Sequence, residues 1–99
     1  MPEALPDLDD ILDLEELNFA LLESLIARVA ASSSWEQLVY REAEIDQVWR
    51  LIDRGQDVAG LPPHVLAGLR EKIMIIHDLV GVDHRPIEAA RLLSSVLYG

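Results

Sequence analysis

Cysteine is absent from this chain of 99 residues, so it forms neither disulfide bonds nor cysteine-containing zinc sites, as is usual in a reducing cytoplasm. Long apolar runs are also missing, because the longest, such as Ile73–Ile76, span about four residues where a membrane-spanning helix needs about 20. The first residues lack the basic and then apolar pattern of a secretory signal peptide. We therefore expect a soluble, cytoplasmic protein that inserts into no membrane.

Basic residues are scarce, and none precedes Arg28. The first 27 residues contain eight acids and so carry −8 of the total net charge of −10. A chain this acidic repels phosphate backbones, and we expect no binding to nucleic acid. The acidic N-terminal arm at residues 1–7 could attract a basic protein partner. Acids near a helix start also favour the helix dipole and solubility, and the sequence leaves both interpretations open.

Apolar residues, by contrast, are abundant. They make up 51% of the chain, and the five glycines raise this share to about 56%, against roughly 45–50% in ordinary domains by the same count. A single domain of 99 residues has only a small interior. Some apolar surface should therefore be exposed or shared with another chain, which is either a protein partner or a second copy in a homodimer.

Apolar side chains recur at helical spacing in four segments, and no segment shows the alternation typical of a strand. We predict one all-α domain, in which an antiparallel helical hairpin is extended to a small bundle of three to four helices. The predicted elements are helices over 8–31, 34–54, 63–80 and 84–98, with a loop over 55–62.

The turn between the first two predicted helices carries the clearest local signal. Either Ser33 with Glu36 or Ser34 with Gln37 has the spacing of a capping box, in which two side chains satisfy free N–H groups reciprocally. Trp35 follows in the first turn of the second helix. We expect its ring to lie across the end of the first helix and to hold the hairpin together.

Glycine and proline mark the other predicted helix ends. Gly55 is placed to end the second helix in a left-handed conformation. Pro62 or Pro63 is placed at the start of the third helix, where a missing N–H costs nothing. Asp83 is a candidate cap for the fourth helix.

Side chains that carry chemistry do not form a recognisable constellation. His64, His77 and His84 are 13 and 7 residues apart, so no two of them share the spacing of paired metal ligands on a helix. Neither a nucleophile elbow nor a phosphate-binding glycine loop is present. We predict a non-enzyme without metal or cofactor. A chorismate-mutase-like enzyme is an alternative, but its dicarboxylate substrate needs several cations, and the first helix offers only Arg28.

Four stretches together resemble the FliT-type flagellar export chaperones. They are the end of the first helix (Leu25–Ala31), the start of the second (Trp35–Leu38), the charged segment Arg41–Asp46, and Leu69–Ile76 behind a proline-marked loop. The family usually has aspartate before the tryptophan where this chain has Ser34, and both residues cap helices.

The resemblance implies a cytoplasmic chaperone that binds the filament-cap protein FliD before type III export. It also implies contacts with the export ATPase or gate and, in some relatives, with a transcription regulator. In that family the last helix folds over a binding surface and regulates access to it. The sequence allows the same arrangement here, because Met74 and Ile75 need a cover, and Ile87, Leu93 and Leu97 of the last helix are our candidate regulatory residues.

We predict that an amphipathic helical segment of the client docks on the apolar surface of the second and third helices. Bundle core is the ordinary alternative for the apolar contacts of the third helix and is favoured for Leu66 and Ile73, and a charged helix edge is the alternative for Glu42. The alternative function is a helical adaptor or regulatory binding protein of another secretion or transcription system. The candidate partner-binding residues are Val65, Leu66, Ile73, Met74, Ile75, Glu42 and Trp49.

Overall fold

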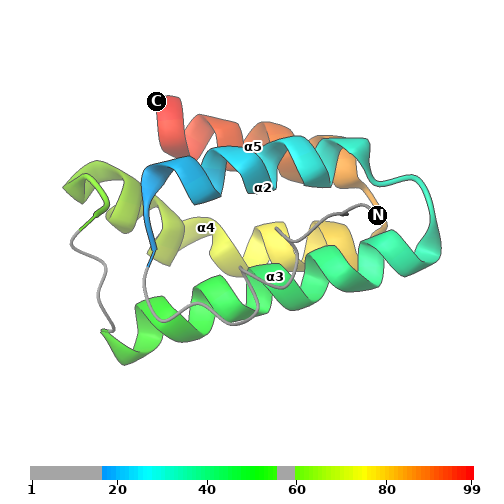
Figure 1. Cartoon of the computed structure of the whole chain (residues 1–99), viewed down its shortest axis with the longest axis horizontal. Helices are drawn as coiled ribbons and strands as arrows, with labels where there is room; N and C mark the ends of the chain where they lie inside the picture. Colours follow the sequence, from blue (N-terminus) through cyan, green and yellow to red (C-terminus); the bar gives the residue numbers. More distant parts are fainter. Residues whose placement is uncertain (1–16, 56–59) are drawn as a thin grey trace, which may run out of the picture.

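Four helices account for most of residues 17–55 and 60–99, which are the parts of the chain that the computed structural model describes (Figure 1). They are α2 (Phe19–Ala31), α3 (Trp35–Arg54), α4 (Pro63–Gly81) and α5 (Pro86–Tyr98). The described ranges contain no strand, and Asn18 and Gly60 form only an isolated bridge. The predicted all-α bundle is therefore confirmed, with four helices in the described ranges.

Consecutive helices run antiparallel, but the closest neighbours in space are not always neighbours in sequence (Figure 1). α4 packs against both α3 and α5, and α5 also packs against α2. The helices α2 and α3 are joined by the short turn at residues 32–34, yet they contact each other much less. The predicted hairpin is therefore right about how α2 and α3 are connected. Most of the packing, however, is between other pairs of helices.

α2 is shorter than the helix predicted over 8–31. Asn18 has an extended backbone, with φ −145° and ψ 167°, and its Oδ1 atom accepts a hydrogen bond of 2.9 Å from the N–H of Leu21. A continuous helix through residues 17 and 18 is therefore wrong, because asparagine competes for backbone N–H groups and favours a helix start over a helix interior. Residues 8–16 and the predicted acidic arm at 1–7 lie outside the described residues.

The capping box at the start of α3 is formed by Ser34 and Gln37. The Gln37 N–H donates to Ser34 Oγ at 3.2 Å, and the Ser34 N–H donates to Gln37 Oε1 at 3.2 Å. At the other end Gly55 adopts the left-handed conformation with φ 69°, which favours glycine. α3 therefore begins and ends where the sequence predicts.

Proline is the first residue of both remaining helices. Pro63 begins α4, as predicted, since the first helical position needs no N–H group. Pro86 begins α5 two residues after the predicted start, because a residue before proline avoids helical dihedrals and Arg85 lies at φ −118° and ψ 70°. The prediction of Asp83 as the cap is wrong, since Arg85 occupies the N-cap position.

The core takes apolar side chains from all four helices. One member from each helix shows this burial, and each exposes 1% of its surface or less: Leu25, Ile45, Ile76 and Leu93. Since each helix buries one face in this shared interior, the opposite faces and the helix ends are left to form any binding surface.

Candidate functional site

Two of the predicted partner contacts are interior residues. Val65 and Ile73 expose 0% and 1% of their surface and belong to the core, because α4 directs this stripe of residues toward the centre of the bundle. A partner cannot reach them, so their assignment as contacts is wrong, and the ordinary alternative of bundle core is right for Ile73. Leu66 and Trp49 are half-buried and pack against the edge of the core.

Met74 and Ile75 remain at the surface, with 49% and 51% of their area exposed. They lie on opposite flanks of the buried stripe of α4, since each step along a helix turns by about 100°. The predicted cover by the last helix is therefore wrong. Both side chains are accessible to a partner, and their role as contacts stays a prediction.

α5 is an integral part of the bundle and not a lid over those two residues. Leu93 and Leu97 expose 1% and 2% of their surface in the core, and α5 packs against both α2 and α4. At Gly68 of α4 the two helices come so close that a Cβ atom would lie 3.0 Å from Val96 Cγ1. Moving α5 would open the core, and the regulatory role of Leu93 and Leu97 stays a prediction. Ile87 is 51% exposed.

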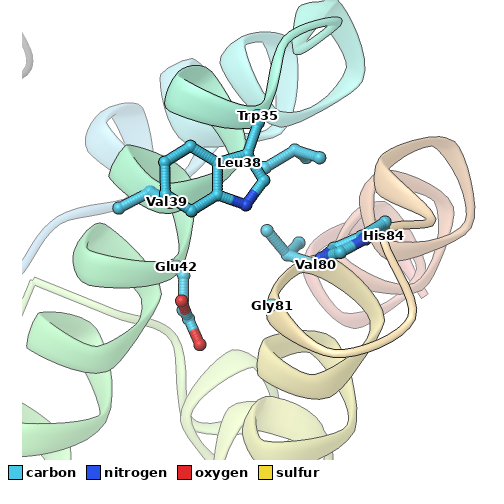
Figure 2. Close-up of a pocket in the computed structure, with 7 residues that line it drawn as sticks. All are labelled: Trp35, Leu38, Val39, Glu42, Val80, Gly81 and His84. Atoms are coloured by element: carbon cyan, nitrogen blue, oxygen red, sulfur yellow. The ribbon is translucent and has the colours of Figure 1, made fainter.

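A hollow of about 140 Å³ lies where the start of α3 meets the end of α4 (Figure 2). Trp35 extends over it from α3, with 70% of its surface exposed. We name this site the Trp35 hollow, and its lining residues are Trp35, Leu38, Val39, Glu42, Val80, Gly81 and His84.

The position of Trp35 corrects one expectation from the sequence. Its ring does not lie across the end of α2 but shares the Trp35 hollow with Val80 of α4 and His84 in the loop after it (Figure 2). Trp35 is the first residue of α3, and Val39 and Glu42 follow it at helical spacing on the same side of the helix. This spacing is the sequence signal that could have identified the hollow.

Glu42 reaches from α3 toward α4. Its Oε2 atom is 3.5 Å from Nε2 of His77, and a Cβ atom at position 81 would come within 2.2 Å of the same oxygen. Gly81 therefore leaves the room that this carboxylate occupies. The Glu42 side chain keeps 36% of its surface exposed, so a ligand in the hollow can contact it. Of the predicted contacts, Glu42 is the one that lines the Trp35 hollow.

Three exposed acids stand close in sequence to the residues that line the Trp35 hollow. Glu36, Asp78 and Asp83 are exposed near its lining residues in sequence. Arg85, which follows His84 of the lining, is bound to Glu88 of α5 at 3.1 Å.

A second group of charges is closed to solvent. Glu44 exposes 0% of its surface and contacts two guanidinium groups, Arg41 Nε at 2.8 Å and Arg28 Nη2 at 3.3 Å. Burial lowers the pKa of Arg41, and attraction by Glu44 offsets part of that effect. Because Arg28 belongs to α2, the pair with Glu44 links two helices that otherwise make few contacts. These charges are structural and lie apart from the residues that line the hollow.

Metal ligands do not cluster in the described ranges. Residues 17–55 and 60–99 contain no group of three or more histidine or acidic side chains that could hold a metal ion. Within the same ranges, every helix is too short or too polar to cross a membrane.

Comparison with models of protein families, with curated proteins and with solved structures gave no match to this chain.

Proposed function

We propose that this chain is a non-catalytic binding protein that holds an amphipathic helical segment of another protein at the Trp35 hollow. The observation that carries the proposal is a tryptophan with 70% of its surface exposed beside a hollow that both apolar side chains and polar ones line. Burying an aromatic side chain of this kind contributes on the order of 2 to 3 kcal/mol. Tryptophan is also among the residues most enriched at the energetic centres of protein interfaces.

Further exposed apolar side chains extend the surface around the Trp35 hollow. Val39 of the lining exposes 43% of its area, and Val82, which directly follows Gly81, exposes 66%. Met74 lies three residues before His77 and therefore on the same flank of α4, which is the flank that meets Glu42 of α3. An amphipathic helix lying along α3 and α4 would cover this surface.

We further propose that the partner is a flagellar client, namely the filament-cap protein, and that the chain acts in the cytoplasm. The sequence resemblance supports this assignment, because its motif residues Trp35 and Leu38 coincide with the exposed hollow. The export ATPase or gate and a transcription regulator are the further partners that the resemblance implies. A helical adaptor of another secretion or transcription system would use the same surface.

The contacts of Arg28 and Arg41 support our proposal that the chain is not an enzyme. An enzyme of the chorismate-mutase type needs several cations that face an open site. Arg28 and Arg41 instead contact the buried carboxylate of Glu44. Each of them is therefore engaged in the bundle and unavailable to a dicarboxylate substrate.

The proposal is tested by measuring the affinity of the purified chain for the filament-cap protein encoded in the same genome. We expect Trp35→Ala to weaken binding at least about tenfold, which corresponds to the loss of one interface anchor. Tyr40→Ala is the matched control, since Tyr40 is also exposed on α3, at 43%, but does not line the hollow. We expect this control to bind like the wild type.

Two results would contradict separate parts of the proposal. Equal weakening by both substitutions, or by neither, would reject the Trp35 hollow as the binding site. A genome without flagellar genes, or a cap protein that does not bind, would reject the flagellar assignment. In that case, photocrosslinking from position 39 identifies the partner in the cell, and its affinity for the same variants then tests the hollow alone.

A further inference from the structure

The Trp35 hollow combines an aromatic face with a carboxylate. The indole of Trp35 is 70% exposed, and the side chain of Glu42, with 36% exposed, lines the same space of about 140 Å³. An indole face attracts cations through its quadrupole. A carboxylate binds a guanidinium group through two parallel hydrogen bonds. Both groups therefore favour a cation in the hollow.

The charged side chains nearby also favour a cationic ligand. The imidazole of His77 lies between two carboxylates, 3.5 Å from Glu42 Oε2 and 3.6 Å from Asp78 Oδ1. Arg85 is held by Glu88 on the side of α5. A phosphate or carboxylate ligand would meet this acidic surface and a chain of net charge −10. A basic segment would be attracted to it.

The hollow is also suited to the apolar part of a long basic side chain. Leu38, Val39 and Val80 surround the space next to the carboxylate. Arginine buries its methylene stem along apolar surface while its charged end binds a polar group. Its planar guanidinium stacks on aromatic faces and is more weakly hydrated than the ammonium of lysine. Of the two basic side chains, arginine fits this combination better.

We propose that the Trp35 hollow binds an arginine of the partner, with its guanidinium stacked on Trp35 and paired with Glu42. The bound segment is then a basic amphipathic helix, whose apolar side packs on the exposed valines of this end of the bundle. The inference rests on the proposed function, because it specifies what the partner presents to the same site. It adds that Glu42 selects the charge of the ligand.

The first test uses a small probe of the chemistry alone. N-acetyl-arginine amide is titrated into the full chain, and the indole N–H resonance of Trp35 is followed by NMR. N-acetyl-citrulline amide is the matched probe, since it keeps the shape and loses the charge. Trp49, half-buried in the middle of α3, is the internal reference. We expect arginine amide alone to shift the Trp35 resonance, and Glu42→Gln to abolish that shift.

The second test uses amphipathic peptides of about 15 residues, long enough to form a helix on binding. One peptide carries arginine at the position facing the hollow, and two others carry citrulline or glutamate there. We expect the arginine peptide to bind about tenfold more tightly than the citrulline peptide, as for loss of a charge-assisted hydrogen bond. In Glu42→Gln the two peptides should bind alike. His77→Gln, which leaves the carboxylate in place, should keep the preference, and so should Glu71→Gln, which removes a charge from an exposed position outside the hollow.

The outcomes separate this inference from the proposed function. If all three peptides bind equally and Trp35→Ala abolishes binding, the hollow is a binding site but the arginine preference is wrong. If the citrulline or glutamate peptide binds more tightly than the arginine peptide, the assigned charge is wrong. If Trp35→Ala leaves the binding of every peptide unchanged, and if no probe shifts the Trp35 indole resonance of the wild-type chain, the proposed function at this site fails as well.

Discussion

Glu42 and Glu44 stand two positions apart on α3, and they face different helices. Glu44 exposes none of its surface and lies between Arg28 and Arg41, whereas the side chain of Glu42 is 36% exposed and meets His77 of α4. Two positions on a helix differ by about 200° around its axis, which is why one carboxylate points toward α2 and the other toward α4. The same residue type thus serves the stability of the bundle at one position and its open surface at the other.

Replacing each glutamate by glutamine should give the largest contrast. We expect Glu44→Gln to lower the free energy of unfolding by about 3 kcal/mol, because the buried guanidinium of Arg41 and the partly buried one of Arg28 lose their countercharge. Glu42→Gln should cost less than about 1 kcal/mol, as for a partly exposed pair. Urea denaturation of both variants measures the difference. Equal losses would show that the two environments do not differ energetically.

The double variant Arg41→Met with Glu44→Leu sharpens the interpretation of that contrast. A buried ion pair replaced by apolar side chains of similar volume is often close to neutral in stability. The double variant should therefore recover the part of the loss in Glu44→Gln that comes from the unpaired Arg41, whereas Arg28 still lacks its countercharge. A loss as large as in the single variant would mean that the ion pair itself stabilises the bundle. The loss in Glu44→Gln would then not be due only to a charge left unpaired.

The two tryptophans of α3 extend the comparison to apolar side chains. Trp49 is half-buried against the core, and we expect Trp49→Ala to cost about 2 to 3 kcal/mol through lost packing. Trp35 is 70% exposed, so Trp35→Ala should cost less than about 1 kcal/mol. Thermal unfolding followed by circular dichroism reports both. A large loss in Trp35→Ala would show that the ring holds α3 against α4.

Gly81→Ala separates stability from binding at the hollow. The added Cβ atom would come within 2.2 Å of Glu42 Oε2 and displace that carboxylate. Because the displaced group is the end of a flexible side chain, we expect a change in unfolding free energy of at most about 1 kcal/mol. Binding of the arginine peptide should fall about tenfold, as in Glu42→Gln. Unchanged binding would show that the position of Glu42 is unimportant.

A third glutamate gives the smallest expected effect. Tyr98 of α5 donates a hydrogen bond to Glu23 of α2 at the protein surface, and this bond raises the pKa of Tyr98 above its usual value of 10. The folded state therefore favours the protonated phenol, so the bond contributes at all pH values below 10 and is lost as the pH rises through the raised pKa. Ultraviolet titration should show one tyrosine that ionises later in wild type than in Glu23→Gln. Identical titrations would contradict the bond.

Local signals in the sequence predict most of the helix boundaries. Ser34 with Gln37, Gly55 and Pro63 act through backbone groups within a few residues, so their effect is visible without the rest of the fold. The start of α2 was missed because apolar spacing continues past Asn18, and that spacing alone does not show where the backbone leaves the helix. Proline at position 86 was a better guide to the start of α5 than the acid before it.

The candidate site was harder to predict because it depends on which helices become neighbours. The apolar spacing separates Ile73 from Met74, but only the packing of α4 against α3 and α5 shows that no helix covers Met74. Trp35 was expected to contact α2, its neighbour in sequence, and it lies instead beside the end of α4. Glu42 is a candidate contact from the sequence alone, although its partner His77 comes from a distant part of the chain.

The pairing of α2 with α5 has a consequence for how the protein is made. The first described helix finds its main apolar neighbour only after α3 and α4 have been synthesised. Until then its leucines are exposed on the nascent polypeptide. The next helix, α3, follows after a short turn but contacts α2 little. The contact between α2 and α5 should therefore form only after α5 has been synthesised, and contacts between distant segments of this kind slow folding compared with a bundle of sequential neighbours.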